Sequence, residues 1–199
     1  RRIDGIIPRQ DMPEDVSLSA EETRRLCTNA LDVLIRLHDI DVTATPLAPM
    51  DRGDGYVARQ VGGWSARFRN ARTPDVGDYE DVMAWLEGHQ PADLAHCLIH
   101  NDFRFDNLVL AHDDPTRPIG VLDWEMATVG DPLMDLGGTL AYWVESGDDE
   151  FFRQFRRQPT NLPGMLTRDE VVDYYCAARG IEMDAERWRF YEVFGLFRL

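Results

Sequence analysis

Apolar residues recur at helical spacing in several parts of the chain, and the clearest case lies near its start. Ser19 and Glu22 have the spacing of a capping box, in which two side chains bond each other's backbone N–H groups at a helix N-terminus. The apolar positions that follow are Leu26, Ala30, Val33, Leu34 and Leu37. They share one helical face, so the pattern predicts a helix from Ser19 to about His38.

Further helices are predicted where the same period occurs beside residues suited to a helix start or stop. They span about residues 57–68, residues 79–86 before Pro91, a segment from the N-cap Asp131 and Pro132 through about Ser146, a segment after the capping box Thr167 and Glu170, and a segment after Asp184. The chain is therefore expected to be mainly helical.

The period changes between residues 97 and 122. Residues 97–99, 108–110 and 119–122 are apolar runs that are too short for helices and are separated by polar turns. We expect three short strands, of which the second and third form a hairpin. The predicted fold class is α+β, predominantly helical, with a short β-hairpin that bears the active site.

Composition narrows the class of protein. The chain has 199 residues, 44% of them hydrophobic, which is enough to bury one core. A formal net charge of −15 opposes binding to nucleic acid, and it indicates either a cationic substrate or only a solvated acidic surface. No apolar run of about 18 residues and no signal-peptide pattern occurs. We expect a cytoplasmic protein without a membrane partner; the oligomeric state is left open.

The cysteines Cys27, Cys97 and Cys176 lie far apart in apolar or helical patterns. Their spacing is not that of a zinc site or a disulfide framework. They are expected to be buried, reduced thiols.

Oxygen-bearing side chains gather around the predicted hairpin. Asn107 directly precedes its first strand and Asp123 directly follows its second, so strand pairing places both at one end of the hairpin. Asp102, in the preceding loop, can fold over the same end. Carboxylate and amide oxygens suit Mg²⁺, and a separate carboxylate can accept the proton of an attacking hydroxyl. We therefore assign Asn107 and Asp123 to the metal and Asp102 to the hydroxyl.

The residues from His100 to Asn107 form the pattern His-x-Asp-x-x-x-x-Asn, and a hydrophobic strand ending in Asp123 follows. This pattern resembles the catalytic loop and metal-binding Asp of protein kinases. The form His100-Asn101-Asp102, with Asp123-Trp124-Glu125, is similar to aminoglycoside phosphotransferases and choline kinases. It looks most like the phosphotransferase domains associated with acyl-CoA dehydrogenases.

This resemblance implies the C-terminal lobe of a protein-kinase-like fold and the activity of a small-molecule kinase. The expected cofactors are Mg²⁺ and ATP, with ATP as the phosphoryl donor. Asp102 is the implied catalytic base, and Asn107 and Asp123 are the implied metal ligands. The expected partner is a small molecule with a hydroxyl group, either a hydroxyacyl-CoA or an aminoglycoside-like compound.

The resemblance covers nearly the whole chain and implies its domain boundaries. The expected parts are the end of the interlobe linker at 1–18 and the kinase-like C-lobe at 19–199, with a helical insertion at about 40–95, the catalytic loop and hairpin at 97–123 and C-terminal helices at 132–199. All 21 basic residues are arginine, and no glycine-rich strand-turn-strand occurs. We expect the ATP-binding lobe to lie outside this chain and the isolated chain to be a poor or inactive kinase.

Residues near the proposed site are expected to support it. His100 could act as the general base, but the resemblance gives it a structural role, bonding nearby backbone, since Asp102 already supplies the base. Asp135 is expected to form a salt bridge to the catalytic loop. Arg104 meets a phosphate or the carboxylate of Asp135, or is only solvated. Glu125 binds a second metal ion, acts through water or lies at the surface. Strand alternation predicts that Asp106 turns away from the metal and braces the loop or is exposed.

Two other functions remain open at this point. A metal-dependent phosphoesterase could use His100, Asp102, Asn107 and Asp123, and it would bind a transition metal tightly. The other possible function is that of a non-catalytic, pseudokinase-like lobe that binds a partner or ligand.

Overall fold

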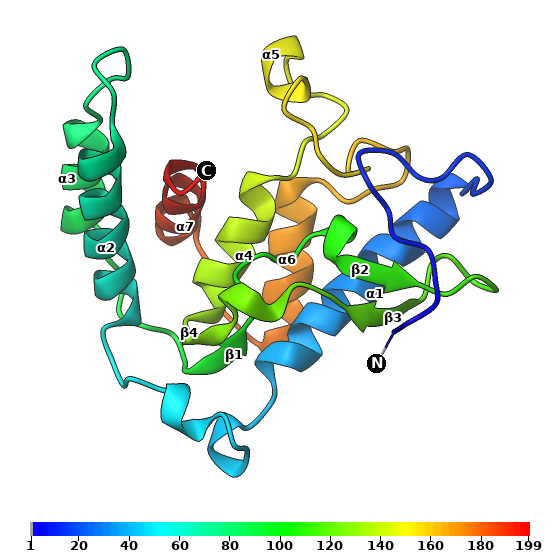
Figure 1. Ribbon diagram of the computed structural model, residues 1–199, viewed down its shortest axis with the longest axis horizontal. Coiled ribbons are helices and arrows are strands. Elements are labelled where there is room, and N and C mark those ends of the chain that lie inside the picture. The colour runs from blue at the N-terminus through cyan, green and yellow to red at the C-terminus, as the bar shows by residue number, and fades with distance from the viewer. Residues whose placement is uncertain (1) are drawn as a thin grey trace.

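Ser19 begins the long helix that crosses the centre of the molecule (Figure 1). In the computed structural model, which describes residues 2–199, this helix is α1 (Ala20–His38). The Ser19 hydroxyl accepts the Glu22 N–H at 3.3 Å, and the Glu22 carboxylate accepts the Ser19 N–H at 2.9 Å. The predicted capping box and the extent of this helix are confirmed.

Six further α-helices are found within residues 2–199: α2 (Tyr56–Ala71), α3 (Glu80–Gly88), α4 (Pro132–Ala141), α5 (Glu150–Arg153), α6 (Arg168–Arg179) and α7 (Ala185–Phe197). Short 3-10 turns occur as η1 (Val42–Ala44), η2 (Ala48–Met50), η3 (Phe105–Asn107) and η4 (Trp124–Met126). All the predicted helices are present, whereas α5 was not predicted. No helix in the described part of the chain is long and apolar enough to span a bilayer.

Helix α4 ends at Ala141, so the prediction that it continues to about Ser146 is wrong. The next three carbonyl groups accept hydrogen bonds from distant side chains: Tyr142 from Gln158, Trp143 from Arg168 and Val144 from Thr160. These bonds satisfy the carbonyl groups without a further helical turn. The apolar residues are therefore buried in a non-helical segment.

Within the described residues, four short strands form two antiparallel pairs. The predicted hairpin is confirmed: β2 (Leu108–Leu110) pairs with β3 (Pro118–Val121). The predicted strand β1 (Cys97–Ile99) pairs with β4 (Thr128–Gly130), which was not predicted. The loop from β1 to β2 and the loop from β3 to β4 therefore both run between the same two strand pairs. This topology brings residues 100–107 beside residues 122–127.

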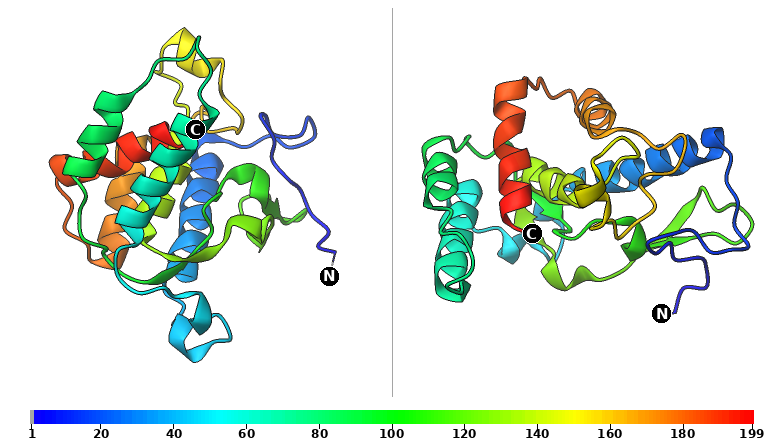
Figure 2. Two further views of the ribbon diagram at one scale, coloured as in Figure 1. Left: turned by 60° about the vertical axis from the view of Figure 1, so that its left-hand side comes forward. Right: turned by 90° about the horizontal axis from the view of Figure 1, so that it is seen from above.

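Helices α2 and α3 pack together at one end of the molecule, and the hairpin lies at the opposite end with the N-terminal segment (Figures 1 and 2). In that segment Ile6 and Leu110 exchange two backbone hydrogen bonds, of 2.8 and 2.7 Å. Helices α4 and α7 lie so close that a Cβ on Gly137 would meet the Tyr191 carbonyl oxygen at 2.6 Å.

The three cysteines are buried free thiols, as expected. Burial raises the pKa of Cys27 to about 12. They contribute to the core, where α1, α4, α6 and α7 meet.

Candidate active site

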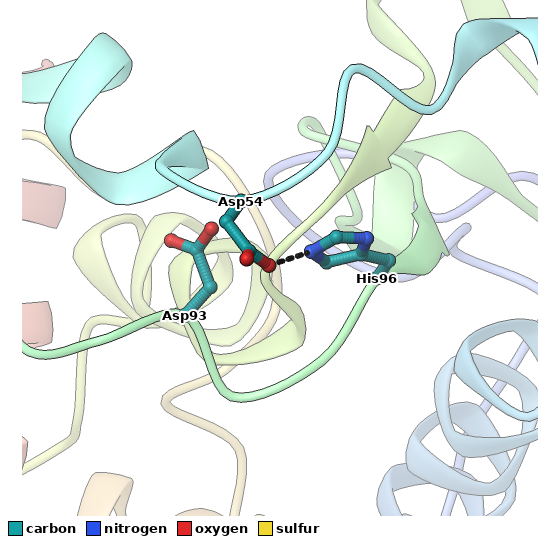
Figure 3. Close-up of side chains that lie close together, drawn as sticks. All are labelled: Asp54, Asp93 and His96. Carbon is teal, nitrogen blue, oxygen red and sulfur yellow. Dashed lines mark hydrogen bonds and ion pairs between the residues drawn. The ribbon is translucent and has the colours of Figure 1, made fainter.

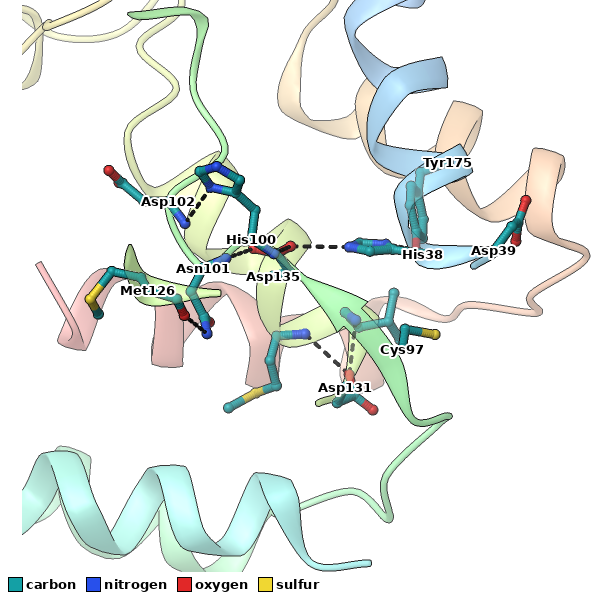
Figure 4. Close-up of polar contacts among 12 residues, drawn as sticks. His38, Asp39, Cys97, His100, Asn101, Asp102, Met126, Asp131, Asp135 and Tyr175 are labelled. Carbon is teal, nitrogen blue, oxygen red and sulfur yellow. Dashed lines mark hydrogen bonds and ion pairs between the residues drawn. The ribbon is translucent and has the colours of Figure 1, made fainter. Parts of the chain in front are cut away.

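A fully buried carboxylate holds the loop that follows β1 (Figure 4). Asp135 accepts the backbone N–H of His100 at 2.8 Å and that of Asn101 at 2.7 Å. His38 Nε2 lies 3.0 Å from the same carboxylate, and the Tyr175 hydroxyl lies 2.6 Å from His38 Nδ1. Burial raises the pKa of Asp135, but the His38 side chain and the two N–H groups outweigh it and hold the pKa below the ordinary value. Asp135 therefore holds the loop through backbone N–H groups and pairs with His38 of α1, so the expected salt bridge from Asp135 to the loop is wrong.

Asn101 turns the chain at this point in a left-handed conformation, with φ of 65°. Asparagine tolerates this region better than most residues. Its side-chain amide donates to the Met126 carbonyl at 3.0 Å. Arg198 of the α7 C-cap donates to its backbone carbonyl and, at 3.3 Å, to its side-chain oxygen. Together with Asp135 of α4, the contacts from η4 and from the end of α7 fix the turn that presents Asp102.

Asp102 is held from both sides and remains partly exposed. Its carboxylate accepts the Asn107 side-chain amide at 3.0 Å, and its backbone carbonyl accepts the same amide at 2.8 Å. Arg104 Nε lies 3.2 Å from Asp102 Oδ1, an ion pair rather than a well-directed hydrogen bond. The structure thus brings Asp102 and Asn107 together, as the sequence predicts.

Both ring nitrogens of the buried His100 have backbone partners. Nε2 lies 2.8 Å from the Leu122 carbonyl oxygen, and Nδ1 lies 3.3 Å from the Asp102 backbone nitrogen. An Nε2–H tautomer satisfies both contacts, as donor to the first and acceptor of the second. The geometry suits a structural role that ties the catalytic loop to the end of β3. It leaves neither nitrogen free to bind a metal.

Asn107 and Asp123 lie at one end of the hairpin, because Leu108 is opposite Val121 and the Leu122 N–H donates to the Asn107 carbonyl at 2.8 Å. The Asn107 amide nitrogen is committed to Asp102, so the side chain has its amide oxygen left as a ligand. Asp123 is exposed, has φ of 61°, and its side chain makes no capping bond. One carboxylate and one amide oxygen fit the preference of Mg²⁺ for hard oxygen ligands.

Arg104 pairs with aspartates of its own loop and not with Asp135. Its ion pairs within residues 2–199 are with Asp102 and, at 3.2 Å, with Asp106, so the alternative in which it meets Asp135 is wrong. Its guanidinium also lies over the Tyr142 ring, 4.7 Å from the centroid. The two ion pairs and the Tyr142 ring thus hold the positively charged guanidinium of Arg104 beside Asp102.

Asp106 lies in the 3-10 turn η3, so the strand alternation used to place it does not apply. Burial raises the pKa of its carboxyl, although the charge of Arg104 opposes this shift. The ion pair with Arg104 makes Asp106 a brace of the loop. Glu125 is exposed in η4, where it could reach solvent or a ligand.

Four residues that organise the site were missed from the sequence: His38, Tyr175, Gln158 and Arg198. The buried Gln158 accepts the Phe105 N–H at 2.9 Å and so holds the far end of the loop. Only His38 gave a usable signal, because it falls four residues after Leu34 on the buried face of α1. The others lie far from the loop in sequence.

Two cavities differ in the charge of the residues that line them. One, of about 530 Å³, lies beside α4 and α7, and its lining includes Glu145, Asp148, Asp149, Asp169 and Glu192. The other, of about 440 Å³, is lined by Arg104, Arg156, Arg157, Asp106, Gln10, Gln154 and Phe155. The second cavity shares Arg104 with the Asp102 ion pair, so it directly adjoins the catalytic loop.

Comparison with known proteins gives a family and relatives that agree with the resemblance noted in the sequence. A model of the family described as "Phosphotransferase enzyme family" matches residues 1–192. Acyl-CoA dehydrogenase family member 10 of Mus musculus is 35% identical over 190 residues, covering 94% of this chain and 18% of that protein.

Solved structures agree. A protein from Ralstonia eutropha assigned as an aminoglycoside phosphotransferase has a TM-score of 0.80 and 25% identity, covering 99% of this chain and 59% of that one. The aminoglycoside phosphotransferase APH(3'')-Id from Streptomyces rimosus, in complex with ADP and streptomycin, shares the fold, with a TM-score of 0.55 and 22% identity over 92% of this chain and 65% of its own. The chain thus spans about a fifth of the mouse relative and about three fifths of the bacterial structures.

Proposed function

Because the chain belongs to the phosphotransferase enzyme family, we propose that it forms the acceptor-binding and metal-binding part of an ATP-dependent small-molecule kinase. The observation that carries the proposal is the placement of Asp102. Its partly exposed carboxylate is fixed by Asn107 and Arg104, at the end of the hairpin that also carries Asp123.

In this mechanism Asp102 accepts a hydrogen bond from the acceptor hydroxyl, orients its oxygen and takes up its proton. Arg104 holds the carboxylate in place and adds positive charge where phosphate oxygens would arrive. Asn107 Oδ1 and the Asp123 carboxylate would hold Mg²⁺, which neutralises charge on the phosphates when bound. A phosphoesterase that uses His100 as a ligand is less well supported, because both ring nitrogens have backbone partners.

ATP is the proposed donor, supported by the ADP bound to the Streptomyces relative. The chain has no lysine, and residues 2–199 form no glycine-rich strand pair that could hold nucleotide phosphates. We therefore expect the 199-residue chain alone to transfer phosphate poorly and to need a nucleotide-binding lobe.

A hydroxylated acyl-CoA is the proposed acceptor. The name of the mouse relative supports an acyl-CoA ligand. The cavity that shares Arg104 with the active site also presents Arg156 and Arg157, and guanidinium groups suit the phosphates of coenzyme A. We do not expect a nucleic-acid partner, because the net charge is −15.

A cationic, aminoglycoside-like acceptor is the second candidate. It is favoured by the carboxylate-rich cavity beside α4 and α7, where the one arginine, Arg168, is already paired with Asp148 at 2.7 Å. The streptomycin bound to the Streptomyces relative supports the same class.

The test uses the intact protein that contains this chain. ATP consumption is measured with a hydroxyacyl-CoA, the matched acyl-CoA without the hydroxyl, and a panel of aminoglycosides. Asp102→Asn should lower kcat by about 10²–10⁴-fold, because it removes the proton acceptor, while ATP still binds. Asp113→Asn, at an exposed ion pair with Arg117, should leave turnover unchanged. Undiminished turnover by Asp102→Asn would refute the mechanism, and the preferred substrate decides between the acceptor classes.

A further inference from the structure

His96, Asp54 and Asp93 lie together where the segment before α2 approaches the start of β1 (Figure 3), and Asp51 lies beside His96. His96 directly precedes β1, and its Nδ1 lies 3.0 Å from Asp51 Oδ2. Its Nε2 lies 3.1 Å from Asp54 Oδ1 on the other side of the ring. One ligand atom each from Asp54, Asp93 and His96 lie within 4.8 Å of one another. None of these residues takes part in the proposed phosphoryl transfer.

The two sides of the His96 ring cannot both be satisfied by a neutral imidazole. Such a ring carries one N–H and one lone pair. If the Nδ1–H donates to Asp51, the Nε2 atom faces the Asp54 carboxylate, and either a proton or a divalent cation can bridge these two atoms. Metal-binding histidines commonly donate their other N–H to a carboxylate in this manner, which fixes the tautomer and the direction of the ring. Asp51 has the position of that outer carboxylate.

The third ligand is also held in place. The Asp93 carboxylate accepts the backbone N–H groups of Tyr56 and Val57, at 2.8 and 2.9 Å, at the start of α2. A carboxylate has about four lone-pair sites, so two bonds leave capacity for a metal. Asp54 is fully exposed and can close the site from the solvent side.

We propose that His96 Nε2 and the carboxylates of Asp54 and Asp93 bind a divalent transition metal of the Zn²⁺ type, with Asp51 orienting the imidazole. An imidazole ligand favours zinc, cobalt or nickel over Mg²⁺ or Ca²⁺, which take oxygen ligands. Three protein ligands leave a fourth tetrahedral position for water. The site is separate from the oxygen pair of Asn107 and Asp123.

The proposed metal site is connected to the active site through the first turn of α2. Asp93 links the metal to the first turn of α2, and Tyr56 in that turn places its hydroxyl 3.5 Å from the Asn101 side-chain oxygen. Asn101 precedes the proposed base. Metal binding would therefore restrain α2 next to the catalytic loop.

The test titrates the purified 199-residue chain with Zn²⁺ by calorimetry and with Co²⁺ by visible absorption. Wild type should bind one equivalent and show the intense visible bands of four-coordinate cobalt. His96→Ala should remove this binding, and Asp51→Asn should weaken it by about 10–100-fold. His112→Ala, at an exposed histidine 3.8 Å from Asp4, is the matched control and should bind as wild type does.

Circular dichroism checks that each variant is folded, and Asp54→Asn gives a second variant at an exposed position. Failure of folded wild type to bind Zn²⁺, or equal affinity in wild type and His96→Ala, overturns the proposal. Binding that survives His96→Ala but is lost in Asp123→Asn also overturns it, because the metal then lies at the hairpin.

Discussion

Replacement of Asp135 by asparagine should destabilise the protein, because one buried carboxylate serves three donors. Oδ2 faces the His100 N–H and His38 Nε2, whereas Oδ1 faces only the Asn101 N–H. In Asp135→Asn the amide oxygen can keep the first two partners. The amide nitrogen then opposes the Asn101 N–H, and two donors face each other in a buried site.

The magnitude follows from these contacts. A buried N–H group without an acceptor costs about 1–3 kcal/mol. The two remaining bonds lose the assistance of the negative charge, which roughly halves their strength. We expect the free energy of unfolding to fall by about 2–4 kcal/mol, out of the roughly 5–15 kcal/mol typical of a domain.

Urea unfolding followed by far-UV circular dichroism measures this change. Asp113→Asn is the matched control, because that side chain is 78% exposed, and it should shift the unfolding free energy by no more than about 0.5 kcal/mol. A loss of less than about 0.5 kcal/mol in Asp135→Asn would mean that the buried carboxylate does not hold the loop.

Asp135→Asn also tests how the stabilisation by Asp135 depends on pH. Because the folded pKa of Asp135 lies below its unfolded value, its stabilisation is present at neutral pH and is lost as the pH falls through the folded pKa. The difference in unfolding free energy between wild type and Asp135→Asn should be constant above about pH 5 and shrink below about pH 4. A difference that does not change with pH would contradict the lowered pKa.

Two further predictions concern the scaffold and use the same unfolding measurement. Gly164 has φ of 91°, and a Cβ there would lie 1.9 Å from the Ala20 carbonyl oxygen, so Gly164→Ala should destabilise by more than about 2 kcal/mol. Gly62→Ala, in α2 with nothing within 4 Å of the added Cβ, should instead stabilise by about 0.5–1 kcal/mol; equal effects of the two would refute this account. Ser19→Ala should cost about 1 kcal/mol by removing the cap that accepts the Glu22 N–H, and no loss would show that the cap is dispensable.

Features set by local sequence were predictable. The capping boxes at Ser19 and Thr167 are formed as expected, because their bonds join residues only three positions apart. The hairpin from β2 to β3 was predicted from two apolar runs around a polar turn. The placement of Asn107 and Asp123 at its end followed from strand pairing alone.

Features set by distant partners were not predictable. The end of α4 depends on side chains 16 to 25 residues away, and the apolar residues Trp143 and Val144 continued the helical period past it. Strand β4 has three residues, one of them Gly130, and becomes a strand because β1 is its partner. Arg104 is a different case, because its partners Asp102 and Asp106 are only two residues away, but sequence spacing alone does not show which way its side chain turns in the loop.

The contact between Arg198 and Asn101 makes the intact site depend on the last turn of α7. Arg198 lies one residue past that helix and stacks over Trp64 of α2, 5.6 Å from the ring centroid, while it donates to Asn101. A gene copy with a substitution at codon 198 would still encode Asp102, Asn107 and Asp123. A motif search would classify its product as competent, although the turn before Asp102 would have lost the guanidinium that ties it to both helices.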